Sequence, residues 1–455
     1  MVVNSKSITK TISIPDDVKF ILSVLQTYNI EAYIVGGCVR DSLLGRTPND
    51  WDICTAATPE EVKKIFSKFH VIETGIQHGT VTIMYNGEPY EITTFRCDGD
   101  YSDGRHPDQV EFVRDLEQDL DRRDFTINAM VYDGKGKVYD YHYGIIDLDQ
   151  KRINTVGNPD ERFKEDALRM LRAFRFRAQL GFKIESTVMQ AIVNNKDSIN
   201  LVSKERIMSE INKILLSDNP DVIGAISLCG LFDDIIPELK ECFRVPQNNP
   251  YHIYYVGDHI MHSMQEIEPT LHLRLTMLFH DIAKPAFRTT DEQGIDHFHG
   301  HAEGSAKVAL EILTNLRYNT DTVNRVVQLI QYHDAEIVPT RAAIKRWLNK
   351  LGEEVFRDLL KVRQADISAQ NEEHMPERYN KLSKAHNVLE EVLASQECFD
   401  RKSLAVNGND LIAIGFKPGK EIGTVLEELM QHVLDNPEEN TNFNLLVIAN
   451  SKLKR

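Results

Sequence analysis

Several features of other protein classes are missing from this chain of 455 residues. No apolar run approaches the roughly 18 residues that a membrane span needs. The start, MVVNSKSITKTISIPDD, has neither the apolar core nor the small-residue cleavage site of a secretory signal. The six cysteines show no CxxC spacing, which indicates free thiols in a reducing compartment. We therefore expect a cytoplasmic protein with no membrane partner.

The chain also has fewer basic than acidic residues. The 53 Lys and Arg residues are outnumbered by 69 Asp and Glu, for a net charge of −16. This balance argues against indiscriminate binding to polyanions, although a local basic groove remains compatible with it. Internal repeats and low-complexity tracts are missing too. The length, with 42% hydrophobic residues, predicts a globular protein of two to four domains.

The residues that are present change character near position 150. Before it, PDDVKFILSVLQTYN has helical periodicity with Pro15 just inside its start, and TPEEVKKIFSKF begins after Thr58 as an N-cap. TVTIMY and PYEITTF are strand-like and are separated by the hairpin signal NGE. After residue 150 the periodicity is helical. The predicted fold class is α+β, a head with a small mixed or antiparallel sheet followed by helices.

The stretch RTPNDWDIC places two carboxylates, Asp50 and Asp52, at the start of a strand-like run. On a strand, residues two apart point to the same face, where two carboxylates repel each other unless a cation lies between them. Hard oxygen ligands suit Mg²⁺. Upstream, Gly36 and Gly37 precede a helical stretch that holds Arg40, and backbone N–H groups there can approach a triphosphate. The alternative is a solvated turn capped by Asp50.

Taken together, VGGCVRDSLLGRTPNDWDI resembles the nucleotide-binding and metal motif of the class II nucleotidyltransferases. This group contains the tRNA CCA-adding enzymes and the bacterial poly(A) polymerases. The resemblance implies that Asp50 and Asp52 are catalytic and hold Mg²⁺, and that Gly37 and Arg40 seat the nucleotide.

A second motif lies in DLDRRDFTINAM, residues 119–130. It resembles the next motif of the same family, in which Arg123 would contact the triphosphate. Asp124 and Asn128 would tie the catalytic head to the helical region after it. The alternative is a helix start with ordinary pairing between residues four apart.

A charged stripe marks KEDALRMLRAFRFRAQLGF, residues 164–182, which we expect to form one helix. Asp166, Arg169, Arg172 and Arg175 recur every three residues, and a solvated face is the simple explanation. A carboxylate beside a guanidinium, however, offers an acceptor next to a donor. Cytosine and adenine present the matching order on their pairing edges, whereas uracil and guanine present the reverse. In the family that the sequence resembles, this helix selects the base, and Arg172 and Arg175 would hold the nucleotide or its phosphates.

The polar segment FRCDGDYSDGRHPDQVEF, residues 95–112, has the composition of a mobile loop. It resembles the flexible loop that family members need for adding A and that CC-adding relatives shorten or lose. Its presence argues for complete CCA addition, or for A addition, over CC addition alone.

Histidines gather in a second region, where residues 250–335 hold nine of the sixteen. GDHIMHS, LTMLFHDIAKP, HFHGHAEGS, QYHDAE and RQADISAQ together resemble the HD-domain phosphohydrolases, apart from Ala283 where a glycine is usual. The resemblance implies a divalent ion (Mn²⁺, Ni²⁺, Co²⁺ or Mg²⁺) whose ligands are His259, in preference to His262, with His280, Asp281 and Asp366. Lys284, His301 and His333 would serve a second metal or the phosphate. The alternative is a relic domain that only packs.

On these motifs the chain is identified as a member of the CCA-adding family carrying an HD domain. The predicted function is template-independent addition of CCA to the tRNA 3′ end from CTP and ATP, with release of pyrophosphate. A poly(A) polymerase, an HD phosphohydrolase with an inactive head and a non-catalytic RNA-binding protein are the alternatives. The expected domains are a nucleotidyltransferase head (1–152), a helical template and neck (153–215), a helical connector (216–250), the HD domain (251–375) and a helical tRNA-binding tail containing GFKPGKEIG (376–455).

Overall fold

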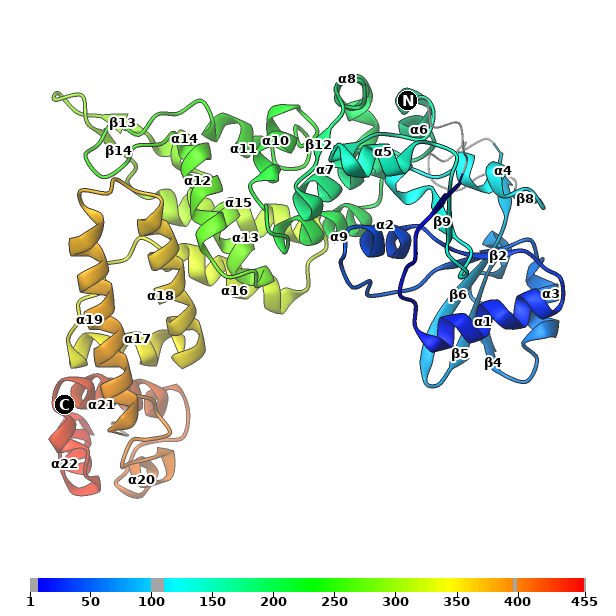
Figure 1. Cartoon of the computed structure of the whole chain (residues 1–455). Coiled ribbons are helices and arrows are strands. Elements are labelled where there is room, and N and C mark those ends of the chain that lie inside the picture. Colours follow the sequence, from blue (N-terminus) through cyan, green and yellow to red (C-terminus); the bar gives the residue numbers. More distant parts are fainter. Residues whose placement is uncertain (1–6, 100–109, 396–398, 454–455) are drawn as a thin grey trace. The chain divides into compact units, whose positions relative to one another are not determined.

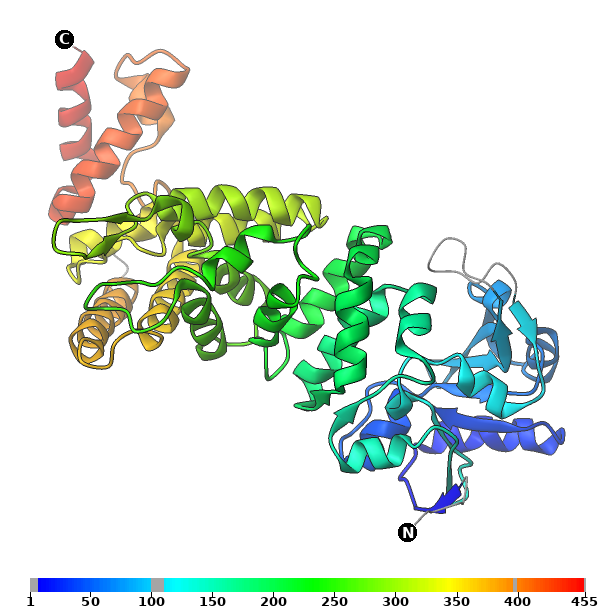
Figure 2. The same cartoon turned by 90° about the horizontal axis from the view of Figure 1, so that it is seen from above.

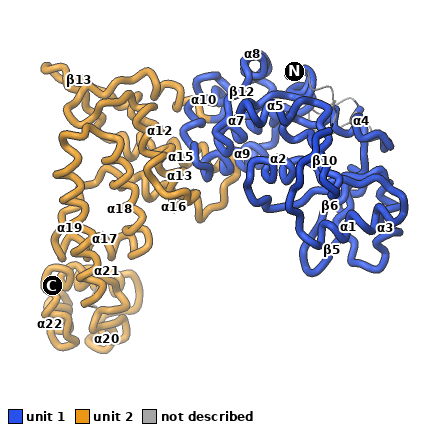
Figure 3. Tube along the Cα trace, in the orientation of Figure 1, with its two compact units in different colours: residues 1–235 blue, residues 236–455 orange. Residues whose placement is uncertain are grey.

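The computed structural model describes residues 7–99, 110–395 and 399–453. The chain forms two compact units, residues 1–235 and 236–455, hereafter unit 1 and unit 2 (Figure 3). The centre of the predicted mobile loop, residues 100–109, lies outside the described residues. None of the described helices combines the length and the apolar character that crossing a membrane requires.

Unit 1 is built on an eight-stranded sheet (Figure 1). The pair β3 and β6 is parallel and the other neighbours are antiparallel, so the sheet is mixed and the α+β class is confirmed. Helices α1, Asp16–Thr27, and α3, Pro59–Ile65, contact its strands. In spatial order the strands are β1 Ser7–Thr9, β10 Lys137–Asp140, β9 Met130–Tyr132, β2 Ala32–Val35, β3 Ile53–Thr55, β6 Glu88–Thr94, β5 Thr80–Tyr85 and β4 His70–Ile72.

Two local predictions are confirmed in this sheet region. Strands β5 and β6 form a hairpin in which Tyr85 faces Glu88, and the two turn residues have positive φ angles, 50° at Asn86 and 87° at Gly87. Such φ angles are what a two-residue hairpin turn requires. Thr58 caps α3 through a reciprocal pair, because its hydroxyl accepts from Glu61 N (3.3 Å) and its own N–H donates to Glu61 Oε2 (2.8 Å).

The rest of unit 1 is helical apart from two short pairs of strands, one of them parallel. The parallel pair joins β11, Arg152–Ile153, to β12, Lys183–Ile184. A further short pair joins β7, Arg96–Asp98, to β8, Val110–Phe112. The helices are α2 Gly37–Leu43, α4 Leu116–Asp121, α5 Gly144–Asp149, α6 Pro159–Glu165, α7 Leu168–Leu180, α8 Ser186–Asn195, α9 Lys204–Leu215 and α10 Val222–Leu228.

The prediction of one helix over residues 164–182 is wrong, because α6 ends at Glu165 and α7 begins at Leu168. Asp166 has extended backbone angles (φ −147°, ψ 104°). Its carboxylate accepts a hydrogen bond from the Leu168 N–H at 3.1 Å. A carboxylate that satisfies a free N–H at a helix start favours a new helix over continuation of the old one. Asp166 therefore belongs to a corner between two helices.

Unit 2 is helical apart from the hairpin of β13, Thr289–Thr290, and β14, Asp296–His297. Its last three helices are red to orange in Figure 2, contact one another and enclose a hydrophobic cluster that includes Leu411, Leu429 and Leu445. The helices are α11 Pro237–Cys242, α12 Val256–Glu266, α13 Leu271–Phe279, α14 Lys284–Phe287, α15 His301–Asn315, α16 Thr320–Tyr332, α17 Arg341–Leu351, α18 Glu353–Ser368, α19 Met375–Ala394, α20 Gly408–Ala413, α21 Lys420–Asp435 and α22 Asn442–Leu453.

Candidate functional site

Asp50 and Asp52, the two carboxylates of the segment RTPNDWDIC, lie immediately before β3. The Asp52 carbonyl accepts from Val35 N at 3.0 Å, so the segment is held against the end of β2. Asp50 and Asp52 share a cavity of about 810 Å³ with groups from four other parts of unit 1. These are the β2–α2 turn, the segment after α4, helix α7 and the end of α9, and they contribute Gly36, Gly37, Arg40, Arg123, Asp124, Asn128, Arg172, Arg175, Phe176 and Lys213 among others.

Charge repulsion acts on Asp52 in this cavity. Desolvation, followed by the negative charges of Asp50 and Glu91, raises the pKa of Asp52 to about 6, while Arg123 acts in the opposite direction. A carboxylate whose ionisation is disfavoured by a neighbouring carboxylate fits a divalent cation, which removes the repulsion. The donor set in the cavity therefore agrees with a metal clamp at Asp50 and Asp52.

Gly36 makes the turn from β2 into α2 possible. Its φ of 84° with ψ of −133° is a conformation that only glycine adopts readily. A Cβ at this position would lie 3.5 Å from a guanidinium nitrogen of Arg123. Arg123 is itself bound by the fully buried Asp119, at 3.3 Å. Asp119 was not singled out from the sequence, although its place four residues before Arg123 is a usable signal.

A continuous chain of hydrogen bonds joins the head to α7. Arg40 donates to Asn128 Oδ1 at 2.6 Å, and Asn128 Nδ2 donates to Asp124 Oδ1 at 3.1 Å. The other oxygen of Asp124 accepts from Arg172 Nε at 2.7 Å. Since Arg172 lies on α7, this chain fixes that helix to the residues after α4.

Phe176 provides a ring surface for three arginines. The guanidinium carbons of Arg175, Arg40 and Arg172 lie 4.4, 5.0 and 5.7 Å from its ring centroid. Glu210 of α9 binds Arg175 at 3.0 Å, and burial lowers the pKa of Arg175 to about 10. The sequence prediction missed Phe176. The feature that could have identified it is an aromatic residue next to the regularly spaced arginines.

Asp166 and Arg169, the predicted base-selecting pair, each have another ionic partner. The Asp166 carboxylate is bound by both terminal nitrogens of Arg206, at 2.7 and 3.2 Å. Arg169 pairs with Glu165 and donates to the Arg162 carbonyl at 3.0 Å. Among the described residues, the lining of the 810 Å³ cavity includes Arg172 and Arg175 but neither member of this pair. Base selection by Asp166 and Arg169 stays a prediction.

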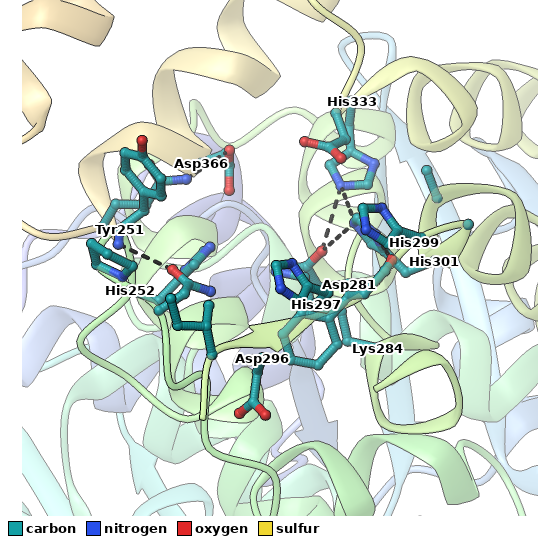
Figure 4. Close-up of a pocket in the computed structure, with 18 of the residues that line it drawn as sticks. Tyr251, His252, Asp281, Lys284, Asp296, His297, His299, His301, His333 and Asp366 are labelled. Atoms are coloured by element: carbon teal, nitrogen blue, oxygen red, sulfur yellow. Dashed lines mark hydrogen bonds and ion pairs between the residues drawn. The ribbon is translucent and has the colours of Figure 1, made fainter. Parts of the chain in front are cut away.

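A second cavity, of about 630 Å³, lies in unit 2 (Figure 4). Three helix ends place histidines at or beside it: His280 follows α13, His301 begins α15 and His333 follows α16. His259 points inward from α12 and is fully buried. One turn further along, His262 is exposed and stacks on Tyr254, with ring centroids 4.2 Å apart. The structure thus places His259, and not His262, with the other predicted ligands.

The predicted ligands are close enough to share an ion. His259 Nε2 lies 3.0 Å from Asp366 Oδ1 and 3.2 Å from His280 Nε2. The pKa values of the Asp281 and Asp366 carboxyls both lie well below the usual value. Burial alone raises the pKa of Asp281, but Lys284, 2.6 Å away, and His280 hold it well below its usual value. Among the described residues, His259, His280 and Asp281 form one candidate metal-binding group, and Asp281, His301 and His333 form another.

His252 lines the same cavity and was not singled out from the sequence. Its ring meets that of His259 edge-on, with centroids 5.1 Å apart. Burial lowers the pKa of His252 to about 2, so it stays neutral, and its buried Nδ1 finds no hydrogen-bond partner within the described part of the chain. The sequence feature that could have drawn attention to His252 is its position in the aromatic run YHIYY before α12.

Models of known families match three parts of the chain. A poly A polymerase head domain matches residues 32–154, and a probable RNA and SrmB-binding site of polymerase A matches residues 181–243. A family described as tRNA nucleotidyltransferase domain 2, putative, matches residues 288–449.

Individual proteins also resemble the chain. A CCA-adding enzyme of Ligilactobacillus salivarius is 48% identical over 238 residues, which is 50% of this chain and 58% of that enzyme. One from Lactobacillus delbrueckii subsp. bulgaricus is 34% identical over 431 residues, 92% of this chain and 94% of the relative. The crystal structure of the Bacillus stearothermophilus CCA-adding enzyme in complex with CTP superposes with a TM-score of 0.72, at 27% identity, over 97% of this chain and 100% of that one.

Proposed function

The chain belongs to the family of CCA-adding enzymes, and we propose on that basis that it adds CCA to the 3′ end of tRNA from CTP and ATP, releasing pyrophosphate. The observation that carries the proposal is the match to named CCA-adding enzymes along nearly the whole chain. This extent does not favour a poly(A) polymerase, and two intact carboxylates in the cavity argue against an inactive head. Because tRNA and free nucleotides are cytoplasmic substrates, we also propose that the enzyme acts in the cytoplasm.

Asp50 and Asp52 are the proposed metal ligands, and Mg²⁺ is the proposed ion. When bound, such an ion activates the 3′-hydroxyl and steadies the leaving pyrophosphate. The chain's own contribution is to position the nucleotide. Arg40 and Arg123, beside Gly37, supply positive charge for the triphosphate on the glycine side of the cavity.

Helix α7 completes the nucleotide site from the opposite side. Arg172 and Arg175 line the cavity, and the ring of Phe176 lies against both. Base choice is assigned to Asp166 and Arg169, whose carboxylate and guanidinium match the pairing edges of cytosine and adenine. Their ion pairs with Arg206 and Glu165 restrict the orientations that the two side chains can adopt.

The function is tested with the purified full chain, tRNA that lacks its CCA end, CTP and ATP. The expected product is tRNA extended by CCA, read by sequencing its 3′ end. Long A tails without C would assign the chain to the poly(A) polymerases instead.

The metal clamp is tested with Asp52→Ala. This variant should lose nucleotide incorporation and keep its affinity for tRNA, because only the ion's ligand is removed. Asp149→Ala, which removes an exposed carboxylate of unit 1, serves as the control and should leave both measurements unchanged. Incorporation at the normal rate by Asp52→Ala would show that the assigned ligand is wrong.

A second activity is proposed for residues 251–375, a metal-dependent phosphohydrolase of HD type. The observation that favours it is the buried group of His259, His280, Asp281 and Asp366 beside the 630 Å³ cavity. Hydrolysis of nitrophenyl phosphate esters should appear with Mn²⁺, Ni²⁺, Co²⁺ or Mg²⁺ and disappear in His280→Ala. Failure of all four ions to support hydrolysis of monoesters and diesters would refute the activity.

A further inference from the structure

A third cavity, of about 270 Å³, lies next to the 630 Å³ cavity of unit 2. It is formed by the segment after α16 together with α18 and α19, two helices that pack against each other (Figure 1). Asp334 and Arg378 belong to the linings of both cavities. A ligand bound in the larger cavity can therefore extend past these two residues into the smaller one.

Positive charge exceeds negative charge in the smaller cavity, although the chain as a whole carries a net charge of −16. Its charged lining residues are three cations and two carboxylates, Arg363, Arg378, Lys381, Asp334 and Glu336. The carboxylate side chains are 61% and 72% exposed, so water screens their charge. The side chain of Arg363 is only 14% exposed, and its charge is screened much less. The cavity therefore favours an anion.

Arg363 is fixed in the wall between the two cavities. Its Nη1 donates to the His333 carbonyl at 2.6 Å and lies 3.8 Å from Asp366 Oδ2. His333 and Asp366 line the larger cavity, whereas Arg363 lines the smaller one. The guanidinium is thus a stationary positive charge for any anion that enters the smaller cavity.

Arg378 is connected to the metal site through a single side chain. It donates to Gln370 Oε1, and Gln370 Nε2 donates to Asp366 Oδ2 at 3.1 Å. Gln370 is 3% exposed, so the connection is buried. The guanidinium carbon of Arg378 also lies 5.2 Å from the ring centroid of Tyr251. A guanidinium has five N–H donors, and the bond to Gln370 uses one of them, which leaves donors for an anion between the two cavities.

Arg378 and Lys381 lie on one face of α19, because residues three apart on a helix are neighbours. Lys381 Nζ lies 2.6 Å from Glu336 Oε1, but both side chains are exposed, and such a pair contributes little. A phosphate group is a stronger partner for both cations. A guanidinium binds phosphate through two parallel N–H donors, and an ammonium binds it as a point charge.

We propose that the 270 Å³ cavity is a subsite for a second phosphate, so that the HD site prefers a phosphate ester that carries two phosphate groups. The inference rests on the phosphohydrolase activity proposed above and names the substrate class of that site. One phosphate lies at the metal site and is hydrolysed: water attacks phosphorus, the ester P–O bond breaks, and the alcohol leaves with a proton from the water. The other phosphate stays intact and is bound by Arg378 and Lys381.

The experiment compares 3′-AMP, 5′-AMP and adenosine 3′,5′-bisphosphate as substrates of the full chain. The divalent ion is the one that supports hydrolysis of nitrophenyl phosphate, and the initial release of inorganic phosphate gives kcat/KM for each ester. No nucleoside triphosphate is present, so the transferase head contributes nothing to the signal. We expect kcat/KM for the bisphosphate to exceed that for the better monophosphate by about tenfold, because charge-assisted hydrogen bonds to phosphate are strong.

Two variants test the assigned residues. Arg378→Gln and, independently, Lys381→Gln should each lower the preference for the bisphosphate by about threefold or more. The ratio of the two kcat/KM values is the readout, because Arg378 is linked to Asp366 and its loss also acts on the metal site. Lys381 lies outside that link. Lys384→Gln, which removes an exposed lysine one turn further along α19 that lines neither cavity, should keep the full preference.

The outcomes separate the subsite from the activity on which it rests. Equal kcat/KM for the bisphosphate and the better monophosphate in the unaltered protein would refute the subsite and leave the HD activity standing. A preference that survives in both Arg378→Gln and Lys381→Gln, with circular dichroism melts showing that each folds, would also overturn the assignment. Hydrolysis of none of the adenosine phosphates and of no nitrophenyl ester would refute the activity and the subsite together.

Discussion

Replacing Asp124 by Asn tests the hydrogen-bond chain that joins the head to α7. Oδ1 of Asp124 accepts from Phe125 N at 2.8 Å and from Asn128 Nδ2 at 3.1 Å, while Oδ2 accepts from Arg172 Nε at 2.7 Å. All of these partners donate, whereas an asparagine side chain has a single oxygen. Asn128 cannot help by reversing its amide, since its own oxygen accepts from Arg40. In either orientation of the new amide, a donor faces a donor.

The cost depends on burial. Asp124 is 9% exposed, and removing one partner of a buried ion pair costs about 3–5 kcal/mol. Since the new amide keeps part of the network, we expect about 3 kcal/mol. In a unit of this size each kcal/mol lowers Tm by about 2–4 °C, which gives a drop of about 6–12 °C. The chain has two tryptophans, so in a Trp347→Phe background the fluorescence of Trp51 reports the melting of unit 1 alone.

The pH dependence has a definite sign. Burial alone raises the pKa of Asp124, but Arg172 and Asn128 hold it well below its usual value. The stabilisation is therefore complete above the pKa of about 3.9 of the unfolded chain and is lost as pH falls below it. The Tm difference between Asp124→Asn and the unaltered protein should be constant from pH 7 to about 5 and shrink below about pH 4.

The control for this prediction is Asp121→Asn. Its side chain is 59% exposed and pairs with His142 at 3.2 Å, so it should change stability by no more than about 0.5 kcal/mol. A drop in Tm for Asp124→Asn no larger than that for Asp121→Asn would refute the argument from the buried chain.

Two further predictions concern unit 1. Arg169→Ala should incorporate UMP and GMP more readily in single-nucleotide assays, because the donor that matches cytosine and adenine is gone; unchanged fidelity would exclude the proposed base selection. Gly36→Ala should lose about 1–3 kcal/mol of stability by thermal melting, because alanine is strained at φ 84° and ψ −133°. Gly423→Ala, whose Cβ would have open space inside α21, should be neutral or stabilising, and an equal loss in both variants would show that the strain at Gly36 is not the cause.

The parts of the fold that depend on near neighbours could be predicted from the sequence. The Asn86–Gly87 turn and the cap at Thr58 depend on residues within three positions of each other. Asp50 and Asp52 could be proposed as a pair because their two-residue spacing and the upstream glycines are local signals, although both residues lie just before β3 and their metal role stays a prediction. The boundary between the two compact units, near Ile235, is not marked by a local sequence signal. It falls within the predicted connector, residues 216–250.

Partners from distant segments could not be predicted. Asp166 is bound by Arg206, 40 residues away. It also accepts a hydrogen bond from the Leu168 N–H, which a continuous helix would pair with a backbone carbonyl instead. Glu210 reaches Arg175 from 35 residues away. His252 stands in an aromatic run that does not point to a metal site, and only the folded chain brings it to His259. Ion pairs between helices depend on the packing angle of those helices, which periodicity does not encode.

The ion pair between Asp124 and Arg172 also sets a minimum length for any fragment that keeps the head intact. A fragment that stops at residue 154, where the match to the head-domain family ends, keeps Asp50, Asp52 and every strand from β1 to β10. It would nevertheless leave the Asp124 carboxylate facing the place of a missing guanidinium, and Phe125 without its contact to Phe176. Residues as far along the chain as Asp218 line the 810 Å³ cavity, so a fragment that keeps the whole lining runs past α9, and proteolysis should release unit 1 whole and not the sheet domain alone.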